Sequence, residues 1–191
     1  MVTEIVILSF LSQRPRHGYE IKKDVEMILH RQTALNNNHL YPTLHRFEES
    51  GVIERVAERT EEIPTRVTYR ITEKGRRLFE ELITSFSDAD AGKEDEFLVR
   101  LAFFGGLEPA TRARILETRK RALERSLAHR QFLAETYPSE TLSPWVQSLI
   151  TFQRGQISGE IAWIEDLQRL ATAMPVEKSV TARASKKQAE E

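Results

Sequence analysis

Apolar positions along the first part of the chain recur at helical spacing. Residues 2–12 are apolar on most sides, which predicts a buried helix. Pro15 and Gly18 bracket a predicted turn, and from Tyr19 to Leu29 the apolar residues recur as in an amphipathic helix. The pattern therefore predicts two helices joined by a short turn.

A third predicted helix carries its own start and stop signals. The triplet Asn36-Asn37-Asn38 favours a helix start, because Asn side chains accept hydrogen bonds from the free amides of a first turn. Leu40, Leu44 and Phe47 lie at i, i+4 and i+7 and form the buried face. The pair Ser50-Gly51 favours the end of this helix.

The pattern then changes to the two-residue period of strands. Residues 52–57 are partly β-branched, and Val67, Tyr69 and Ile71 alternate with polar residues, which together predict a β-hairpin. Thr72 can cap a fourth helix. The apolar face expected for that helix consists of Leu78, Phe79, Leu82, Ile83 and Phe86. Three helices, a hairpin and a helix is the order of a winged helix-turn-helix.

The rest of the chain has a mostly helical pattern. A small polar stretch, residues 87–93, predicts a domain boundary. We therefore expect a mostly α fold with a small β-hairpin, in which residues 1–86 form a winged helix-turn-helix domain and residues 87–173 form a helical domain. The tail, residues 174–191, has few apolar side chains and is expected to be disordered.

Composition removes several classes of function. The 191 residues contain no Cys, which excludes disulfide scaffolds and thiolate metal sites, and no His pair has metal-ligand spacing on a helix. No apolar run approaches the ~20 residues of a transmembrane helix, and no secretory cleavage pattern follows the start, so we expect a cytoplasmic protein without membrane contact. No phosphate loop, nucleophile elbow or His-Glu metal motif occurs, so we expect neither an enzyme nor a cofactor.

Four motifs within residues 3–80 resemble those of one family. They are His17-Gly18-Tyr19-Glu20-Ile21, Leu40-Tyr41-Pro42-Thr43-Leu44, Phe47-Glu48-Glu49-Ser50-Gly51-Val52-Ile53 and Tyr69-Arg70-Ile71-Thr72-Glu73-Lys74-Gly75. Together they resemble the PadR family of transcriptional regulators, and residues 97–104 with the helices after them resemble the C-terminal domain of PadR-like virulence activators. The resemblance implies a dimeric, sequence-specific DNA-binding protein, usually a repressor, with the C-terminal helices as dimer interface.

The third predicted helix is the candidate reader of DNA. A net charge of -1 gives no global attraction for nucleic acid, so the case depends on local placement. Opposite its buried face the helix carries Pro42, His45, Arg46 and Glu49. The Asn, His and Arg side chains of its N-terminal half suit contacts to phosphate and base edges. The Asn triplet is equally typical of a loop and cap. The expected DNA contacts are Lys22, Lys23, Asn37, Asn38, His39, Tyr41, Pro42, Thr43, His45, Arg46, Arg59 and Arg66.

The predicted wing departs from the family pattern. Its tip holds Glu61 and Glu62, where the family commonly has Gly, Pro and basic residues. Two adjacent carboxylates would repel phosphate, although Arg59 and Arg66 flank them and can reach the DNA backbone. We therefore expect the third helix, rather than the wing, to read the sequence.

Two long helices are predicted over residues 109–137 and 144–172. The second would expose more apolar surface than a monomer normally shows, so we expect a homodimer with two-fold symmetry. Gly155 and Gly159 are consistent either with close helix approach or with simple irregularity. The expected interface residues are Trp145, Leu149, Phe152, Ile161, Ile164 and Leu167.

The resemblance also implies a small-molecule effector held between the two domains. Aromatic side chains could line such a pocket, but aromatic residues at helical spacing are more often plain core. The candidate pocket residues are Tyr19, Phe97, Phe104 and Trp145.

These observations favour a cytoplasmic homodimeric repressor that binds a pseudo-palindromic operator in double-stranded DNA and is released by a small effector. One alternative of a different class stays open, namely a protein-interaction module that keeps the winged-helix fold without binding DNA. The acidic wing favours this alternative, and a gel-shift assay separates the two.

Overall fold

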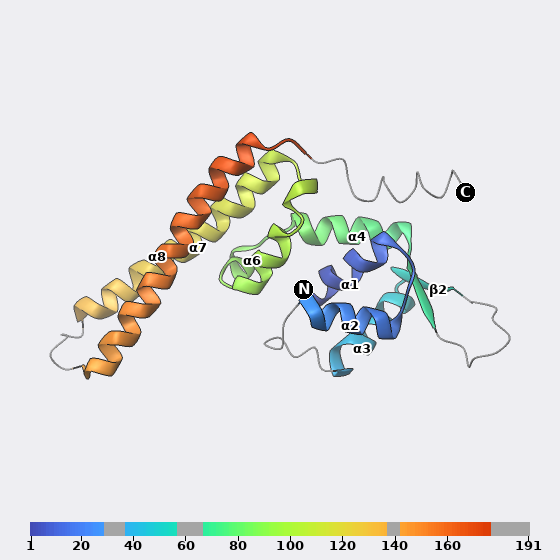
Figure 1. Cartoon of the computed structure of the whole chain (residues 1–191), viewed down its shortest axis with the longest axis horizontal. Coiled ribbons are helices and arrows are strands. Elements are labelled where there is room, and N and C mark those ends of the chain that lie inside the picture. The colour runs from blue at the N-terminus through green and yellow to red at the C-terminus, as the bar shows by residue number, and fades with distance from the viewer. Residues whose placement is uncertain (29–36, 57–66, 137–141, 177–191) are drawn as a thin grey trace. The chain divides into compact units, whose positions relative to one another are not determined.

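The computed structural model describes residues 1–28, 37–56, 67–136 and 142–176, and within these the side chains of residues 24–28 and 37–39 are not described. The chain divides into two compact units, Met1–Ser85 and Phe86–Glu177 (Figure 1). Each unit is described by itself. In the described residues no helix is long and apolar enough to cross a membrane.

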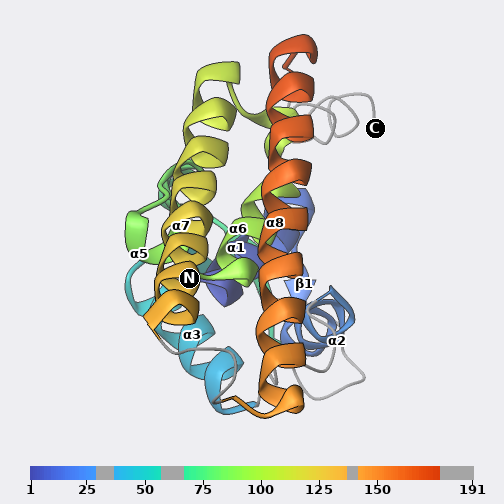
Figure 2. The ribbon, with the colours of Figure 1, turned by 90° about the vertical axis from the view of Figure 1, so that its left-hand side faces the viewer.

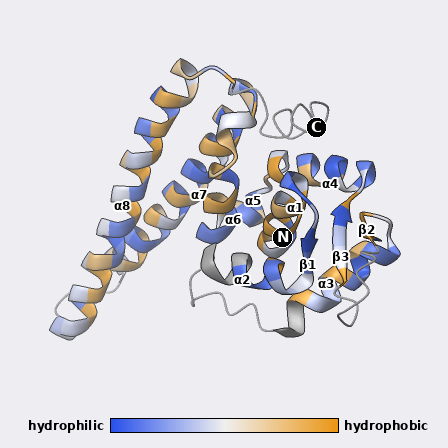
Figure 3. Ribbon diagram, turned by 45° about the vertical axis from the view of Figure 1, so that its right-hand side comes forward, coloured by the Kyte–Doolittle hydropathy of each residue, from blue (hydrophilic) through white to orange (hydrophobic). Residues whose placement is uncertain are grey.

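The core of the first unit is built on α1 (Val2–Gln13). Its residues are buried on most sides, as the continuous apolar run predicts, and Figure 3 colours much of this helix as hydrophobic. The helix packs against α2 (Gly18–Ile28), α4 (Glu73–Thr84) and strand β3. The helix α3 (Asn37–Glu49) turns Leu40, Leu44 and Phe47 into the core as the sequence predicts.

The sheet of this unit has three strands rather than the two of the predicted hairpin. Strands β1 (Arg16–His17), β2 (Ile53–Val56) and β3 (Thr68–Ile71) are antiparallel in the order β1-β3-β2. Strand β1 occupies the segment that the sequence predicts to be a turn. It is too short for a periodic signal and is defined by pairing with a strand about 50 residues away, which a local pattern cannot reveal.

The start of α4 is fixed by a cap and by one glycine. The Thr72 hydroxyl accepts a hydrogen bond from the Gly75 amide at 3.1 Å. A Cβ atom at Gly75 would lie 2.2 Å from the Val52 carbonyl oxygen, so only glycine permits this approach of α4 to the start of β2.

One predicted member of the α4 face belongs elsewhere. The helix ends at Thr84, and Ser85 is extended, so Phe86 falls in the second unit. There its ring lies 6.4 Å from that of Phe97. Phe86 therefore does not belong to the apolar face of α4, although its spacing in the sequence fits that face.

The second unit consists of short helices followed by a long helical pair. The predicted boundary stretch contains a short helix, α5 (Asp88–Ala91), capped by Ser87, which precedes α6 (Glu94–Leu101) and the 3₁₀ helix η1 (Phe104–Gly106). The long helices α7 (Pro109–Thr136) and α8 (Pro144–Ala173) run side by side in Figures 1 and 2.

Buried arginines are the feature of this unit that the sequence analysis did not predict. Arg119 on α7 lies against Glu160 on α8 at 2.8 Å and also donates to the Ala91 carbonyl. Arg100 pairs with Glu96 one turn earlier on α6 at 2.7 Å. Charged residues on amphipathic helices normally face solvent, and only the tertiary fold shows that these two are in the core.

The beginning of the predicted disordered tail is ordered. The Met174 amide bonds the Leu170 carbonyl and closes α8, and the Met174 and Pro175 carbonyls accept hydrogen bonds from Arg112. The remainder of that prediction, residues 177–191, lies outside the described residues.

Candidate nucleic-acid interface

The outward face of α3 carries the residues that the sequence predicts to contact DNA. Tyr41, Pro42, His45 and Arg46 are exposed, and Thr43 is half-buried. Pro42 is the sixth residue of the helix, so its missing amide removes the bond to the Asn38 carbonyl and its ring crowds that carbonyl.

Two basic side chains on this face already have carboxylate partners. The Arg46 guanidinium pairs with Glu4 on α1, and Nδ1 of His45 lies 3.3 Å from the Glu49 carboxylate. Partly exposed contacts of this kind contribute little stability, so phosphate can compete for either side chain. Their presence means that DNA must displace an internal partner before it can use these side chains fully.

An ion pair also joins α3 to strand β2 of the sheet. The Nε atom of Arg55 on β2 lies 2.6 Å from the Glu48 carboxylate. The carboxylates of α3 lie in its C-terminal half, where Glu48 already has Arg55 as a partner. The N-terminal half, as far as its side chains are described, carries no carboxylate.

The lysines predicted to touch phosphate differ in exposure. Lys23 on α2 is exposed, whereas Lys22 is half-buried and has an interaction within the chain. Lys23 is the better placed of the two for DNA.

Several predicted contacts fall on parts that are not described. Asn37, Asn38 and His39 belong to the first turn of α3, but nothing is described of their side chains. Arg59 and Arg66 lie outside the described residues. These five contacts stay predictions.

A tyrosine-lined groove beside α3 is a feature that sequence reasoning did not single out. Its volume is about 520 Å³. It is lined by His17, Gly18, Tyr19, Glu20, Tyr41, Val67 and Tyr69. Three of the family-like motifs, those that contain Tyr19, Tyr41 and Tyr69, meet at this groove, and their tyrosines were the available signal.

Two side chains in the groove, those of Glu20 and Tyr69, have pKa values that differ from their usual values. The His17 amide donates to Glu20 at 2.9 Å, and this hydrogen bond is the main reason why the pKa of Glu20 lies below its usual value. Burial raises the pKa of the Tyr69 hydroxyl. At neutral pH the groove therefore holds an ionised Glu20 and a neutral Tyr69.

The predicted dimer residues separate into three groups within the second unit. Trp145, Leu149 and Phe152 are exposed, with 85%, 54% and 61% of their surface accessible. Ile161 is half-buried. Ile164 is fully buried within this chain, so including it among contacts to a second chain was wrong. The remaining residue, Leu167, is half-buried and lines a cavity.

The structure does not bring the predicted effector residues together in one cavity of the second unit. Phe97 is fully buried, with the Trp163 ring 6.1 Å away, and Phe104 lines the cavity next to η1. Trp145 is exposed at the start of α8, and that cavity includes neither Phe97 nor Trp145. Tyr19 belongs to the first unit.

No metal site accompanies these features in the described part of the chain. Among the described residues, no three His, Asp or Glu side chains lie close enough together to hold a metal ion.

The three-stranded wing sheet, the helix α3 with its exposed face and the helical second unit define a winged helix-turn-helix transcriptional regulator. The model of the transcriptional regulator PadR-like family matches residues 7–81. A PadR-like transcriptional regulator from Bacillus cereus is 32% identical over 42% of this chain and 76% of its own, with a TM-score of 0.36.

Solved structures of Bacillus subtilis PadR are also similar to this chain. One, in complex with operator DNA, is 17% identical, covers 90% of this chain and 99% of its own, and has a TM-score of 0.43. Another, in complex with p-coumaric acid, is 17% identical and covers 90% and 96%, with a TM-score of 0.40. No curated protein matches the chain.

The chain belongs to the PadR-like family of transcriptional regulators. This assignment depends on sequence, namely the family match over residues 7–81 and the 32% identity; the TM-scores below 0.5 add nothing to it. The protein is accordingly a DNA-binding regulator and not an enzyme.

Proposed function

We propose that this protein is a homodimeric repressor that reads a pseudo-palindromic operator with the N-terminal half of α3. The observation that supports this most is the exposed run of Tyr41, Pro42, His45 and Arg46 on a helix whose other face is core. A helix of this kind can enter the major groove, where each base pair presents a distinct pattern of donors and acceptors. Residues 1–86 would then be the DNA-binding domain.

Dimerisation is proposed through the predicted helical domain, residues 87–173, which lies within the second unit. Trp145, Leu149 and Phe152 form an exposed stripe on one face of α8, at i, i+4 and i+7. Exposed apolar patches of this size favour association, and a two-fold pairing brings the same patch of two chains together. The half-buried Ile161 would border this interface.

A small effector is the remaining part of the proposal. Bacillus subtilis PadR has been solved in complex with p-coumaric acid, and the present protein belongs to the same family. An effector would act by binding one arrangement of the two DNA-binding domains better than the other. As a transcriptional regulator that binds DNA, the protein would act in the cytoplasm.

The spacing of half-sites tests dimeric reading directly. Two linked reading helices should require half-sites about 10 base pairs apart, or a multiple of this, because that is one turn of B-DNA. Gel shifts are measured on the DNA upstream of the protein's own gene, with 5 or 10 base pairs inserted at the centre of the operator. We expect the 5-base-pair insertion to weaken binding much more than the 10-base-pair insertion.

The alternative is a protein-interaction module without DNA binding. The carboxylates that already contact Arg46 and His45 are the observation in its favour. Equal, weak binding to every DNA in the spacing series would favour this alternative over the repressor.

A further inference from the structure

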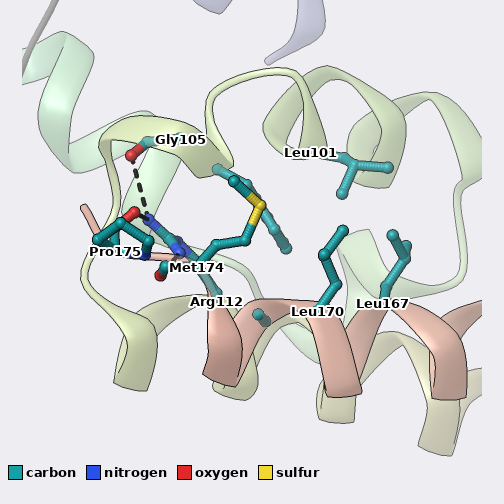
Figure 4. Close-up of a pocket in the computed structure, with 9 residues that line it drawn as sticks. Leu101, Gly105, Arg112, Leu167, Leu170, Met174 and Pro175 are labelled. Atoms are coloured by element: carbon teal, nitrogen blue, oxygen red, sulfur yellow. Dashed lines mark hydrogen bonds between the residues drawn. The ribbon is translucent and has the colours of Figure 1, made fainter. Parts of the chain in front are cut away.

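A cavity in the second unit lies at the C-terminal end of α8, against η1 and the first turns of α7 (Figure 4). Its volume is about 240 Å³, which corresponds to roughly eight water molecules. Most of its wall is apolar. The apolar lining residues are Leu101, Phe104, Leu167, Leu170, Ala171 and Met174.

The same wall contains one buried cation, Arg112, which is only 2% exposed. Its Nη1 atom donates to the Met174 carbonyl at 2.8 Å, and its Nη2 atom donates to the carbonyls of Gly105 and Pro175 at 3.1 and 3.2 Å. Its Nε atom is buried and has no hydrogen-bond partner in the described part of the chain. Among the described residues, the acceptors of this guanidinium are neutral carbonyls, which it uses to hold the ends of η1 and α8 together.

Other buried arginines of this unit have a different environment. Arg100 has the carboxylate of Glu96, and Arg119 has that of Glu160. No such ion pair with Arg112 occurs among the described residues. Buried charges in proteins are normally paired, because a desolvated charge without a counter-charge costs free energy. The positive charge at this wall is thus not neutralised by a described side chain.

We propose that this cavity binds a small amphipathic carboxylate, whose anionic group pairs with Arg112 and whose apolar body lies on the leucine side chains. In Figure 4, Leu101, Leu167 and Leu170 lie on one side of the Met174 side chain and Arg112 lies on the other. Met174 is 43% exposed, and methionine adapts readily to new neighbours, so a rotation of this side chain joins the apolar space to the guanidinium. Charge and apolar surface are then recognised by one ligand.

A matched pair of probes tests the need for charge. Octanoate and 1-octanol have the same chain length, but only octanoate carries a carboxylate. Isothermal titration calorimetry with the full chain, without DNA, should show octanoate binding once per chain and at least tenfold more tightly than 1-octanol. Equal affinities would overturn the proposal, because an apolar cavity without an anion site would bind both.

Variants locate the binding within the molecule. Leu170→Glu places a carboxylate in the cavity wall at a half-exposed position, so it should abolish octanoate binding by supplying the counter-charge. Ser158→Glu, at an exposed position of α8 outside the cavity, is the control and should bind octanoate normally. Unchanged octanoate binding by Leu170→Glu would place the ligand elsewhere and overturn the proposal.

The cation itself is tested by Arg112→Gln, which should remove the preference for octanoate over 1-octanol. If this variant fails to fold because the carbonyls lose their donor, the probe pair and Leu170→Glu still decide the question. A counter-charge supplied by the chain itself is a further outcome. Octanoate binding that appears only in Glu177→Gln would assign that role to Glu177 and overturn the proposal.

Discussion

Arg46 on the exposed face of α3 pairs with Glu4 in the first turn of α1, 42 residues earlier in the chain. The pair lies within the DNA-binding unit and involves a residue predicted to contact a base edge. Glu4 therefore stabilises one position of the Arg46 side chain in the free protein and would compete with DNA for it if Arg46 contacts a base edge. Replacing Glu4 and replacing Arg46 are therefore expected to change the affinity for DNA in opposite directions.

Loss of Glu4 should tighten DNA binding. Glu4→Gln frees Arg46 at the cost of a partly exposed ion pair, which is worth about 0.2–1 kcal/mol, so the affinity for operator should rise by roughly 1.4- to 5-fold. Arg46→Ala should instead lose about 1–3 kcal/mol of binding free energy. Both are measured by fluorescence anisotropy at fixed salt concentration.

The double variant is the control for this pair. In the Arg46→Ala background, Glu4→Gln should have little effect, because there is no longer a guanidinium to release. A gain of the same size in both backgrounds would mean that Glu4 acts only through its general negative charge.

Replacement of Leu149 should break the proposed dimer. Leu149→Glu puts a charge in the exposed apolar stripe of α8, and a buried unpaired charge opposes association. Ser158→Glu is nine residues further on and therefore on the opposite side of the helix, so it should leave the dimer intact. Light scattering at micromolar concentration measures both, and a monomeric wild type would contradict the prediction.

Gly75→Ala should destabilise the first unit. Its Cβ atom would lie 2.2 Å from the Val52 carbonyl oxygen and 2.7 Å from a side-chain carbon of Ile71, so backbone must move. Overpacking of this kind typically costs about 1–3 kcal/mol. Urea unfolding measures the loss, with Gly106→Ala as the control because its Cβ atom would meet nothing within 4 Å.

The hydrogen bond from the His17 amide to Glu20 predicts a pH dependence. The pKa of Glu20 is lowered in the folded state, so its carboxylate stabilises the fold above the usual value of 4.5 and this contribution is lost as the pH falls through the lower, folded value. Glu20→Gln should therefore cost about 0.5–1.5 kcal/mol at pH 7 and progressively less below pH 4.5. A cost that is equal at pH 7 and pH 3 would exclude this role.

Local patterns in the sequence predicted the elements whose apolar spacing is long and regular. The helices α1, α3 and α4, the pairing of β2 with β3 and the long helices α7 and α8 all follow from such spacing. The outward face of α3 followed as well, because the positions of Leu40, Leu44 and Phe47 determine which side chains point away from the core.

The sequence could not reveal features that depend on distant partners. Strand β1 exists because of pairing with β3, and Arg112 and Arg119 are buried because carbonyls or a carboxylate from other helices surround them. Nor does local spacing show that Glu4 reaches Arg46 or that the tyrosines of three motifs line one groove. Each of these relationships is set by tertiary structure.

The most direct test of the account is the specificity of DNA binding by the full chain. Fluorescence anisotropy compares the DNA upstream of the protein's own gene with a shuffled sequence of the same composition, at physiological salt. We predict at least about 1,000-fold tighter binding to the natural sequence, as is typical of specific regulators. Equal affinity for the two DNAs would contradict sequence reading by α3.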